Sequence, residues 1–306
     1  MARRLSTIAV ERSQRARKQG RPARTGWSHP QAAQHGPASW QLLLILWAIV
    51  GLVYANALGN GFVFDDASLV IKVYSSREPW DFLAILHDPW GNIQGRPLRN
   101  LTYDLDYSLG GLNPRIYHLF NIVFHALNTA LVYQLARRLL RGGWPAFVTA
   151  ILFAVHPIQT EAVTNISGRK DLLATLFYLL AFSAFTRYCA LPRAGSLVLT
   201  LLPFLLGLMS KESAVTFPVA CLFYEVIYRT RPPEGRPASA LARGAWQGIR
   251  AALSRHRVVY LILFGMAAAS SGYALLIVRE SQRQAYWGGS IWLTMLTMAR
   301  AFLHYL

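Results

Sequence analysis

The stretch QLLLILWAIVGLVYANAL, from Gln41 to Leu58, decides the fold class of this chain. It carries no charged residue and is long enough to cross the hydrocarbon core of a bilayer as one helix. Residues 1–38, which precede it, are rich in Arg, Gln, Pro and Ala, a composition that cannot bury a core. We therefore expect a disordered, basic cytoplasmic tail at 1–38 and a membrane domain at 39–306.

Seven further apolar segments follow the first one. They are Tyr117–Leu139, Pro145–Pro157, Leu172–Leu191, Ser196–Met209, Ala214–Tyr228, Val258–Val278 and Ile291–Leu306. Three of these segments are short, and those at 145–157 and 196–209 are either true spans or re-entrant or half-buried segments. The pattern predicts an all-α polytopic membrane protein with seven spans and an eighth that the end of the sequence cuts off. We therefore expect the chain to be a fragment of a longer protein.

The composition supports a membrane protein and argues against a nucleic-acid partner. Hydrophobic residues make up 54% of the chain and charged residues only 15%, whereas a soluble domain has about 25% charged residues. A net charge of +17 would indicate nucleic-acid binding in a soluble protein, but here the basic residues flank apolar segments. Cys189 and Cys221 both lie in apolar segments and show no spacing typical of a disulfide framework or a metal site.

The distribution of basic residues predicts the orientation in the membrane. With the N-terminus in the cytoplasm, the inner segments hold twice as many Lys and Arg residues as the outer ones, although most of this excess comes from the tail. We expect an integral protein of the plasma (inner) membrane. Its first outer loop, at about 59–114, then lies on the extracytoplasmic side and holds half of the acidic residues of the chain.

The middle of this loop, EPWDFLAILHDPW at 78–90, has apolar residues on one face and a Trp near each end. This pattern predicts a helix that lies in the membrane interface, or alternatively a helix packed on a small soluble loop domain.

Four polar clusters fall on the outer side in this arrangement. They are FDD at 64–66, GRPLRNLTYDLDY at 95–107, HPIQTEAVTNISGRKD at 156–171 and SKES at 210–213. Ionisable groups that gather at one membrane face are candidates for a functional site. The inner loops contain no comparable cluster of acids, bases and histidines.

Each cluster also has a structural interpretation. The acids Asp65 and Asp66 can cap a turn or hold a cation, and Arg96 and Arg99 can contact lipid head groups. The His156-Pro157 pair can mark a helix end. The run from Arg169 to Asp171 can be an interfacial anchor and a helix start, and Lys211–Glu212 can be a surface ion pair.

A polar stripe runs along the second apolar segment. His118, Asn121, His125 and Asn128 are spaced by three, four and three residues, so they share one helix face. We expect the last three to form interhelical hydrogen bonds. We expect His118, nearer the outer end, to reach a substrate.

At these residues the chain resembles a known family. FVFDD, RPL, HLFNIVFHALNTALVY, HPIQTEAV, NISGRKDLL and SKESAVTFP occur in order between about 56 and 229. They are similar to motifs of the transmembrane, TPR-linked O-mannosyltransferases and their bacterial relatives, members of the GT-C glycosyltransferases. The resemblance implies a GT-C-type helix bundle with interfacial helices in the first outer loop. It further implies transfer of a hexose, by expectation mannose, from a polyprenyl-phosphate sugar to a hydroxyl of a protein or glycan, at the outer membrane face.

The resemblance also implies roles for individual residues. The acidic motif of the family corresponds to Asp65 and Asp66, where related protein mannosyltransferases have Asp-Glu. We expect Asp65 to be the general base, with Asp66 as a helper or cation ligand and inversion at the anomeric carbon. The leaving phosphate needs positive charge in place beforehand. The candidates for it are Arg96, Arg169, Lys170 and Lys211, and the further site candidates are His118, His156, Glu161 and Glu212. No cofactor is certain, a divalent cation is possible, and TPR repeats are expected beyond Leu306.

Two other functions remain open from the sequence. A transporter or lipid flippase would place inverted repeats, broken helices and polar groups near the middle of the membrane, and the sequence shows no such repeat. A noncatalytic membrane scaffold would leave the ordered outer clusters without a role.

Overall fold

The computed structural model describes residues 39–74, 79–81, 96–140, 142–229, 238–281 and 290–305. Within these ranges every regular element is a helix, and no strand occurs. The all-α prediction is therefore confirmed. The tail at 1–38 and most of the predicted interfacial helix at 78–90 lie outside the described residues.

Among the described residues, four helical segments are long and apolar enough to cross a membrane. The first is α2 (Ser39–Tyr54) with the short helix η1 (Ala55–Gly59), and the second is α6 (Pro114–Leu139). The third is η3 (Ile166–Gly168) with α9 (Arg169–Ala190), and the fourth lies in α13 (Arg257–Ser281). These four segments confirm the polytopic membrane fold, but in the described part of the chain they are fewer than the seven complete spans that the sequence predicted.

The remaining apolar segments form shorter helices. They are α7 (Gly143–Val155), α10 (Ala194–Leu208), α11 (Phe217–Tyr224) continued by η5 (Glu225–Arg229), and α14 (Ile291–Tyr305). Both segments that the sequence marked as short, α7 and α10, fall below the length of the four long ones. Each of the eight predicted apolar segments thus corresponds to a helix.

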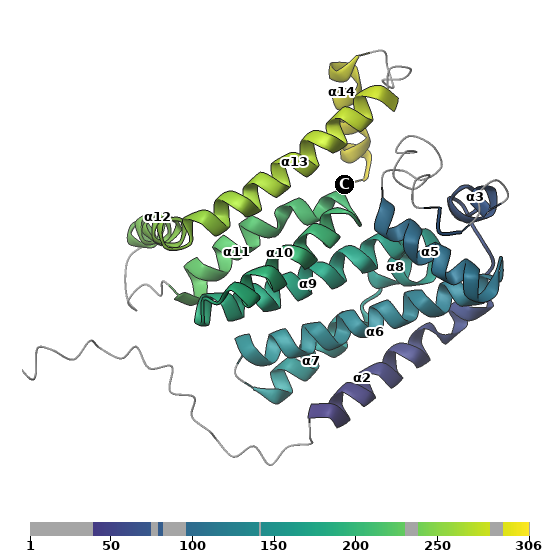
Figure 1. The fold of residues 1–306 in the computed structure, drawn as a ribbon, viewed down its shortest axis with the longest axis horizontal. Helices are drawn as coiled ribbons and strands as arrows, with labels where there is room; N and C mark the ends of the chain where they lie inside the picture. Colours follow the sequence, from purple (N-terminus) through teal and green to yellow (C-terminus); the bar gives the residue numbers. More distant parts are fainter. Residues whose placement is uncertain are drawn as a thin grey trace, which may run out of the picture. The chain divides into compact units, whose positions relative to one another are not determined.

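The helices pack side by side, with α6 and α9 at the centre (Figure 1). Helix α6 contacts α2, α7 and α9, while α9 also contacts α10, which in turn contacts α13. The polar stripe of α6 faces this interior. The Asn121 amide donates to the Val163 and Asn165 carbonyls, that of Asn128 donates to the Leu172 carbonyl, and His125 Nε2 lies 3.0 Å from the Ala154 carbonyl. The predicted interhelical hydrogen bonds are confirmed.

Short elements gather at one end of the bundle. They are η1, η2 (Ala67–Ile71), α3 (Lys72–Tyr74), α5 (Pro97–Gly110), α8 (Gln159–Thr164), η3 and η4 (Glu212–Thr216). The N-termini of α6 and α9 lie at this end, which we call the Asp65 end. The C-terminus of α9, η5 and α12 (Ala238–Arg255) lie at the opposite end, which we call the Cys189 end.

Candidate functional site

The two adjacent acids have different surroundings. Asp66 is fully buried, and its Oδ1 and Oδ2 accept hydrogen bonds from the backbone N–H groups of Ser167 (2.9 Å) and Val63 (3.0 Å). Burial raises the pKa of Asp66, and these two hydrogen bonds partly offset that effect. Asp66 therefore fastens the turn that carries the acidic pair to the junction before α9.

Asp65 is exposed at the surface of the same turn. Its backbone carbonyl accepts from the N–H groups of Ser68 and Leu69 at the start of η2, while its carboxylate makes no hydrogen bond or ion pair within the described residues. The preceding residue, Phe64, has a φ of 47°, which is unusual for a residue other than glycine. This backbone turn presents the carboxylate of Asp65 outward, where it is available to accept a proton.

Two ion pairs place cations at the same end. The Arg96 guanidinium, at the start of α5, donates to both carboxylate oxygens of Glu212 at 3.1 Å. Lys211 forms an ion pair with Asp171 in the first turn of α9. Lys211 and Glu212 are thus paired with other partners, which corrects the interpretation of these two neighbours as a surface ion pair of their own.

Lys170 and Arg99 complete a group of four cations with Arg96 and Lys211. Lys170 is partly buried within electrostatic range of the other three, and no hydrogen bond or close ion pair of its ammonium occurs within the described ranges. Arg99 is fully buried and lies within electrostatic range of both Arg96 and Asp65. The group therefore gathers four cations at the Asp65 end, and two of them, Arg96 and Lys211, are held by Glu212 and Asp171.

Arg169 does not belong to this group. It is fully buried; its Nε donates to Asn121 (2.8 Å), one terminal nitrogen donates to the Tyr117 carbonyl (2.6 Å), and the other pairs with buried Asp106. The guanidinium also lies over the Tyr103 ring, 5.0 Å from its centroid. Because Arg169 is buried, a donor phosphate has no access to it in this structure. Its contacts instead hold α5, α6 and α9 together.

The sequence did not identify the acids of α5, Asp104 and Asp106, as individual site residues. Asp104 accepts a hydrogen bond from the Tyr74 hydroxyl and another from the Trp80 N–H, at 3.1 Å for the latter. Asp106 is the partner of Arg169, and burial raises its pKa to about 6 although Arg169 lowers it in part. Arg99, Tyr103 and Asp106 are spaced by four and three residues, a helical signal that marks one buried face of α5.

Three other candidates lie apart from the cations. His118 is fully buried beside the Asn60–Gly61 backbone, so it does not reach the surface as expected. His156 and Glu161 are exposed near the turn between α7 and α8, where His156 Nδ1 accepts from the Ile158 N–H. The described contacts connect neither of these two with Asp65.

The geometry also bears on the possible divalent cation. Both carboxylate oxygens of Asp66 already accept N–H groups, and Asp65 faces away from it toward solvent. In this conformation the two acids do not offer two carboxylates to one ion.

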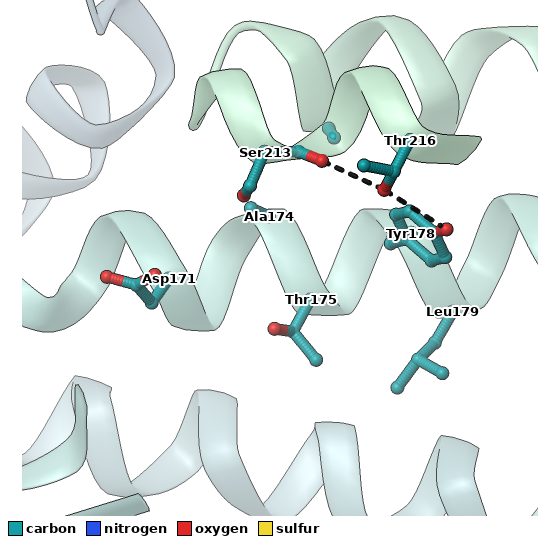
Figure 2. Close-up of a pocket in the computed structure, with 8 residues that line it drawn as sticks. Asp171, Ala174, Thr175, Tyr178, Leu179, Ser213 and Thr216 are labelled. Atoms are coloured by element: carbon teal, nitrogen blue, oxygen red, sulfur yellow. Dashed lines mark hydrogen bonds between the residues drawn. The ribbon is translucent and has the colours of Figure 1, made fainter. Parts of the chain in front are cut away.

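A cavity of about 250 Å³ lies beside the cations, between α9 and the η4 region (Figure 2). Asp171 lines it at the Asp65 end, and Tyr178 and Leu179 line it two turns deeper along α9. The hydroxyls of Tyr178 and Thr216 lie 3.4 Å apart and link its two sides. The cavity therefore extends from the charged group along α9, with the exposed Ser213 and Thr216 on its other side.

Comparison with known proteins agrees with the resemblance seen in the sequence. Residues 97–241 match the family described as dolichyl-phosphate-mannose-protein mannosyltransferase. The chain is 33% identical over 241 residues to the protein O-mannosyl-transferase Tmtc1 of Drosophila melanogaster. This alignment covers 75% of this chain and 27% of that relative. It is 36% identical over 194 residues to protein O-mannosyl-transferase TMTC3 of Homo sapiens, covering 58% of this chain and 21% of that relative.

The chain thus spans only about a quarter of the length of the curated relatives it matches. No solved structure matches it significantly. The family match begins in α5, next to Arg96, and includes Arg169, Lys170 and the η4 turn. The match to the dolichyl-phosphate-mannose-protein mannosyltransferase family therefore covers residues 97–241 of the chain.

Proposed function

We propose that this chain is the membrane part of a glycosyltransferase that moves mannose from a polyprenyl phosphate to a protein hydroxyl at the outer membrane face. The observation that carries the proposal is the exposed Asp65 carboxylate, which lies within electrostatic range of Arg99 at the end of the bundle where Arg96, Lys170 and Lys211 also gather. A base and an anion-binding group side by side are what such a transfer requires. The family and the relatives, named for mannosyl transfer to protein, support the choice of sugar and acceptor.

In the proposed reaction the acceptor oxygen attacks the anomeric carbon of the mannose while the bond from that carbon to the phosphate oxygen breaks. The Asp65 carboxylate takes the proton of the acceptor hydroxyl, and the polyprenyl phosphate leaves with the bonding electron pair. A single displacement of this kind inverts the anomeric centre. Asp66 acts indirectly, because its hydrogen bonds to Val63 and Ser167 hold the turn.

The cations divide into fixed and free charges in this mechanism. Arg96 and Lys211 are oriented by their ion pairs with Glu212 and Asp171, so they stand ready without reorganisation. Lys170 has no such pair in the described part of the chain and is the first choice for direct contact with the phosphate. The neighbouring cavity, with apolar and hydroxyl-bearing walls, accommodates the part of the donor next to the phosphate.

The test uses the full-length protein that contains this chain, reconstituted in liposomes. Transfer is expected from polyprenyl-phosphate-mannose but not from GDP-mannose. Asp65→Asn is expected to lower turnover about 10²–10⁴-fold, as loss of a general base does, without a change in thermal stability. Asp66→Asn is the contrasting variant, because it loses a buried acceptor and lowers stability by about 1–3 kcal/mol.

Two outcomes contradict the proposal. Transfer from GDP-mannose in liposomes free of polyprenyl lipid would rule out the lipid donor. Full turnover by Asp65→Asn would remove the assigned base.

A transporter or lipid flippase is less well supported. Such a protein needs a polar binding site near the middle of the membrane. The polar groups in the middle of α6, His125 and Asn128, instead contact backbone carbonyls of α7 and α9.

A further inference from the structure

Three side chains with metal-binding atoms converge at the Cys189 end. Cys189 comes from the last turn of α9, Glu225 begins η5, and His256 lies between α12 and α13. They are 4%, 0% and 8% exposed, and one ligand atom from each lies within 4.8 Å of the others. Cys189 is twenty residues from Arg169 on α9, about 30 Å at 1.5 Å per residue. The group is therefore separate from the candidate transferase site.

The donor atoms suit zinc. A thiolate, an imidazole nitrogen and a carboxylate oxygen are the ligands that Zn²⁺ uses in proteins, at about 2.0–2.3 Å. In a tetrahedral site such bond lengths place neighbouring ligand atoms about 3.3–3.8 Å apart. His256 Nε2 and Glu225 Oε2 are 3.8 Å apart, and all three ligand atoms lie within 4.8 Å of one another, so no separation exceeds the ideal by more than about 1.5 Å. Small side-chain rotations close that difference.

Surrounding residues orient these ligands. The Tyr260 hydroxyl donates to Glu225 Oε1 at 2.9 Å, so that the other carboxylate oxygen, Oε2, is the one near His256. The Tyr188 ring lies against the His256 imidazole with centroids 5.3 Å apart. Partners of this kind fix metal ligands in protein sites. Buried apolar residues, among them Phe185 and Val259, pack around the group and limit the access of water.

The charges agree with a divalent ion. A thiolate and a carboxylate together carry two negative charges in a nearly water-free place, and Zn²⁺ balances both. Arg255 is the competing partner of Glu225, but its terminal nitrogen is 3.7 Å from Oε2, longer than a hydrogen bond, and its side chain is 47% exposed. Of these two neighbours, Tyr260 therefore holds Glu225 more closely than Arg255 does.

We propose that Cys189, Glu225 and His256 bind one Zn²⁺ ion, with water as the fourth ligand. The ion ties the C-terminal end of α9 to η5 and to the junction of α12 and α13, three elements far apart in the sequence. The Cys spacing gave no sign of such a site, because each ligand comes from a different element.

The experiment measures zinc in the purified full-length protein in detergent by inductively coupled plasma mass spectrometry, after dialysis against a weak chelator. About one zinc per chain is expected. Cys189→Ser and His256→Ala are expected to lose most of it. Cys221→Ser is the matched control: Cys221 is also buried, but it is not one of the three ligands, and this variant keeps the zinc.

A second measurement keeps the proposal testable where a ligand variant does not fold. The Cys221→Ser protein, loaded with Co²⁺ in place of zinc, is expected to show the visible bands of a tetrahedral ion and a thiolate charge-transfer band. Absence of these bands would overturn the proposal. Equal zinc content in the unchanged chain and in folded Cys189→Ser would overturn it as well.

Discussion

At the scale of single residues, hydrogen-bond partners separate the roles of Asp65 and Asp66. The carboxylate of Asp66 is saturated by N–H groups of Val63 and Ser167, which suits a positioning residue, while that of Asp65 stays in solvent. The sequence located the pair but not this division, because two neighbouring acids look alike until their surroundings are known. Arg169 and Lys170 are also neighbours that the sequence does not distinguish. In the structure Arg169 is fully buried, whereas Lys170 is only partly buried and belongs to the cation group.

Asp106 gives a pH prediction at this scale. Burial raises its pKa to about 6, and its Oδ1 has no hydrogen-bond partner in the described part of the chain. Between this value and the ordinary pKa of an Asp, the folded protein binds a proton that the unfolded chain does not, so stability increases as the pH falls through about 6. The unchanged protein is expected to gain stability relative to Asp106→Asn by up to about 1.4 kcal/mol per pH unit in that window.

Thermal unfolding in detergent between pH 7.5 and 5 measures this difference. Asp106→Asn, which lacks the titrating carboxyl, is itself the control. Parallel pH curves for the two proteins would show that the pKa of Asp106 is not raised.

At the scale of elements, α5 is held through its polar face. The Tyr103 hydroxyl donates to the Ile166 carbonyl at 2.8 Å, and Asp106 pairs with Arg169, so α5 is fastened to η3 and α9. The sequence predicted the eight apolar helices because burial in a membrane protein follows hydropathy. It did not predict α5 as a helix, because the residues that this helix buries, Arg99 and Asp104 among them, are polar.

Gly168 tests how closely these elements approach one another. A Cβ added there would lie 2.5 Å from the Ala162 carbonyl oxygen of α8, a backbone atom that cannot move aside alone. Gly168→Ala is therefore expected to displace η3. This shift also moves the Ser167 N–H group, which donates a hydrogen bond to Asp66, so both stability and turnover are expected to fall.

Gly51→Ala in α2 is the matched control, since a Cβ there meets nothing within 4 Å. It is expected to be neutral or to stabilise the helix by about 0.5–1 kcal/mol. Thermal unfolding and transferase assays of both variants check the prediction. A Gly168→Ala protein as stable and active as Gly51→Ala would mean that the approach of η3 to α8 is looser than described.

At the scale of the whole molecule, the proposed chemistry depends on which end of the helix bundle faces the outside. The Asp65 end holds the candidate base, the cations and the neighbouring cavity, whereas the Cys189 end holds the three side chains proposed to bind zinc. Lipid-linked sugars serve an outer site, and a reduced Cys189 suits the cytoplasmic side. Both proposals therefore favour the orientation that the distribution of basic residues predicts.

Two matched leucines test this orientation. Leu112, between α5 and α6, is 46% exposed at the Asp65 end, and Leu191, between α9 and α10, is 61% exposed at the opposite end. In a background with Cys189 and Cys221 replaced by Ser, Leu112→Cys is expected to react with a membrane-impermeant maleimide in intact cells. Leu191→Cys is expected to react only after permeabilisation, because the proposed orientation places its end of α9 in the cytoplasm. The reverse pattern would put Asp65 on the side of nucleotide sugars, and the lipid-phosphate donor would lose its rationale.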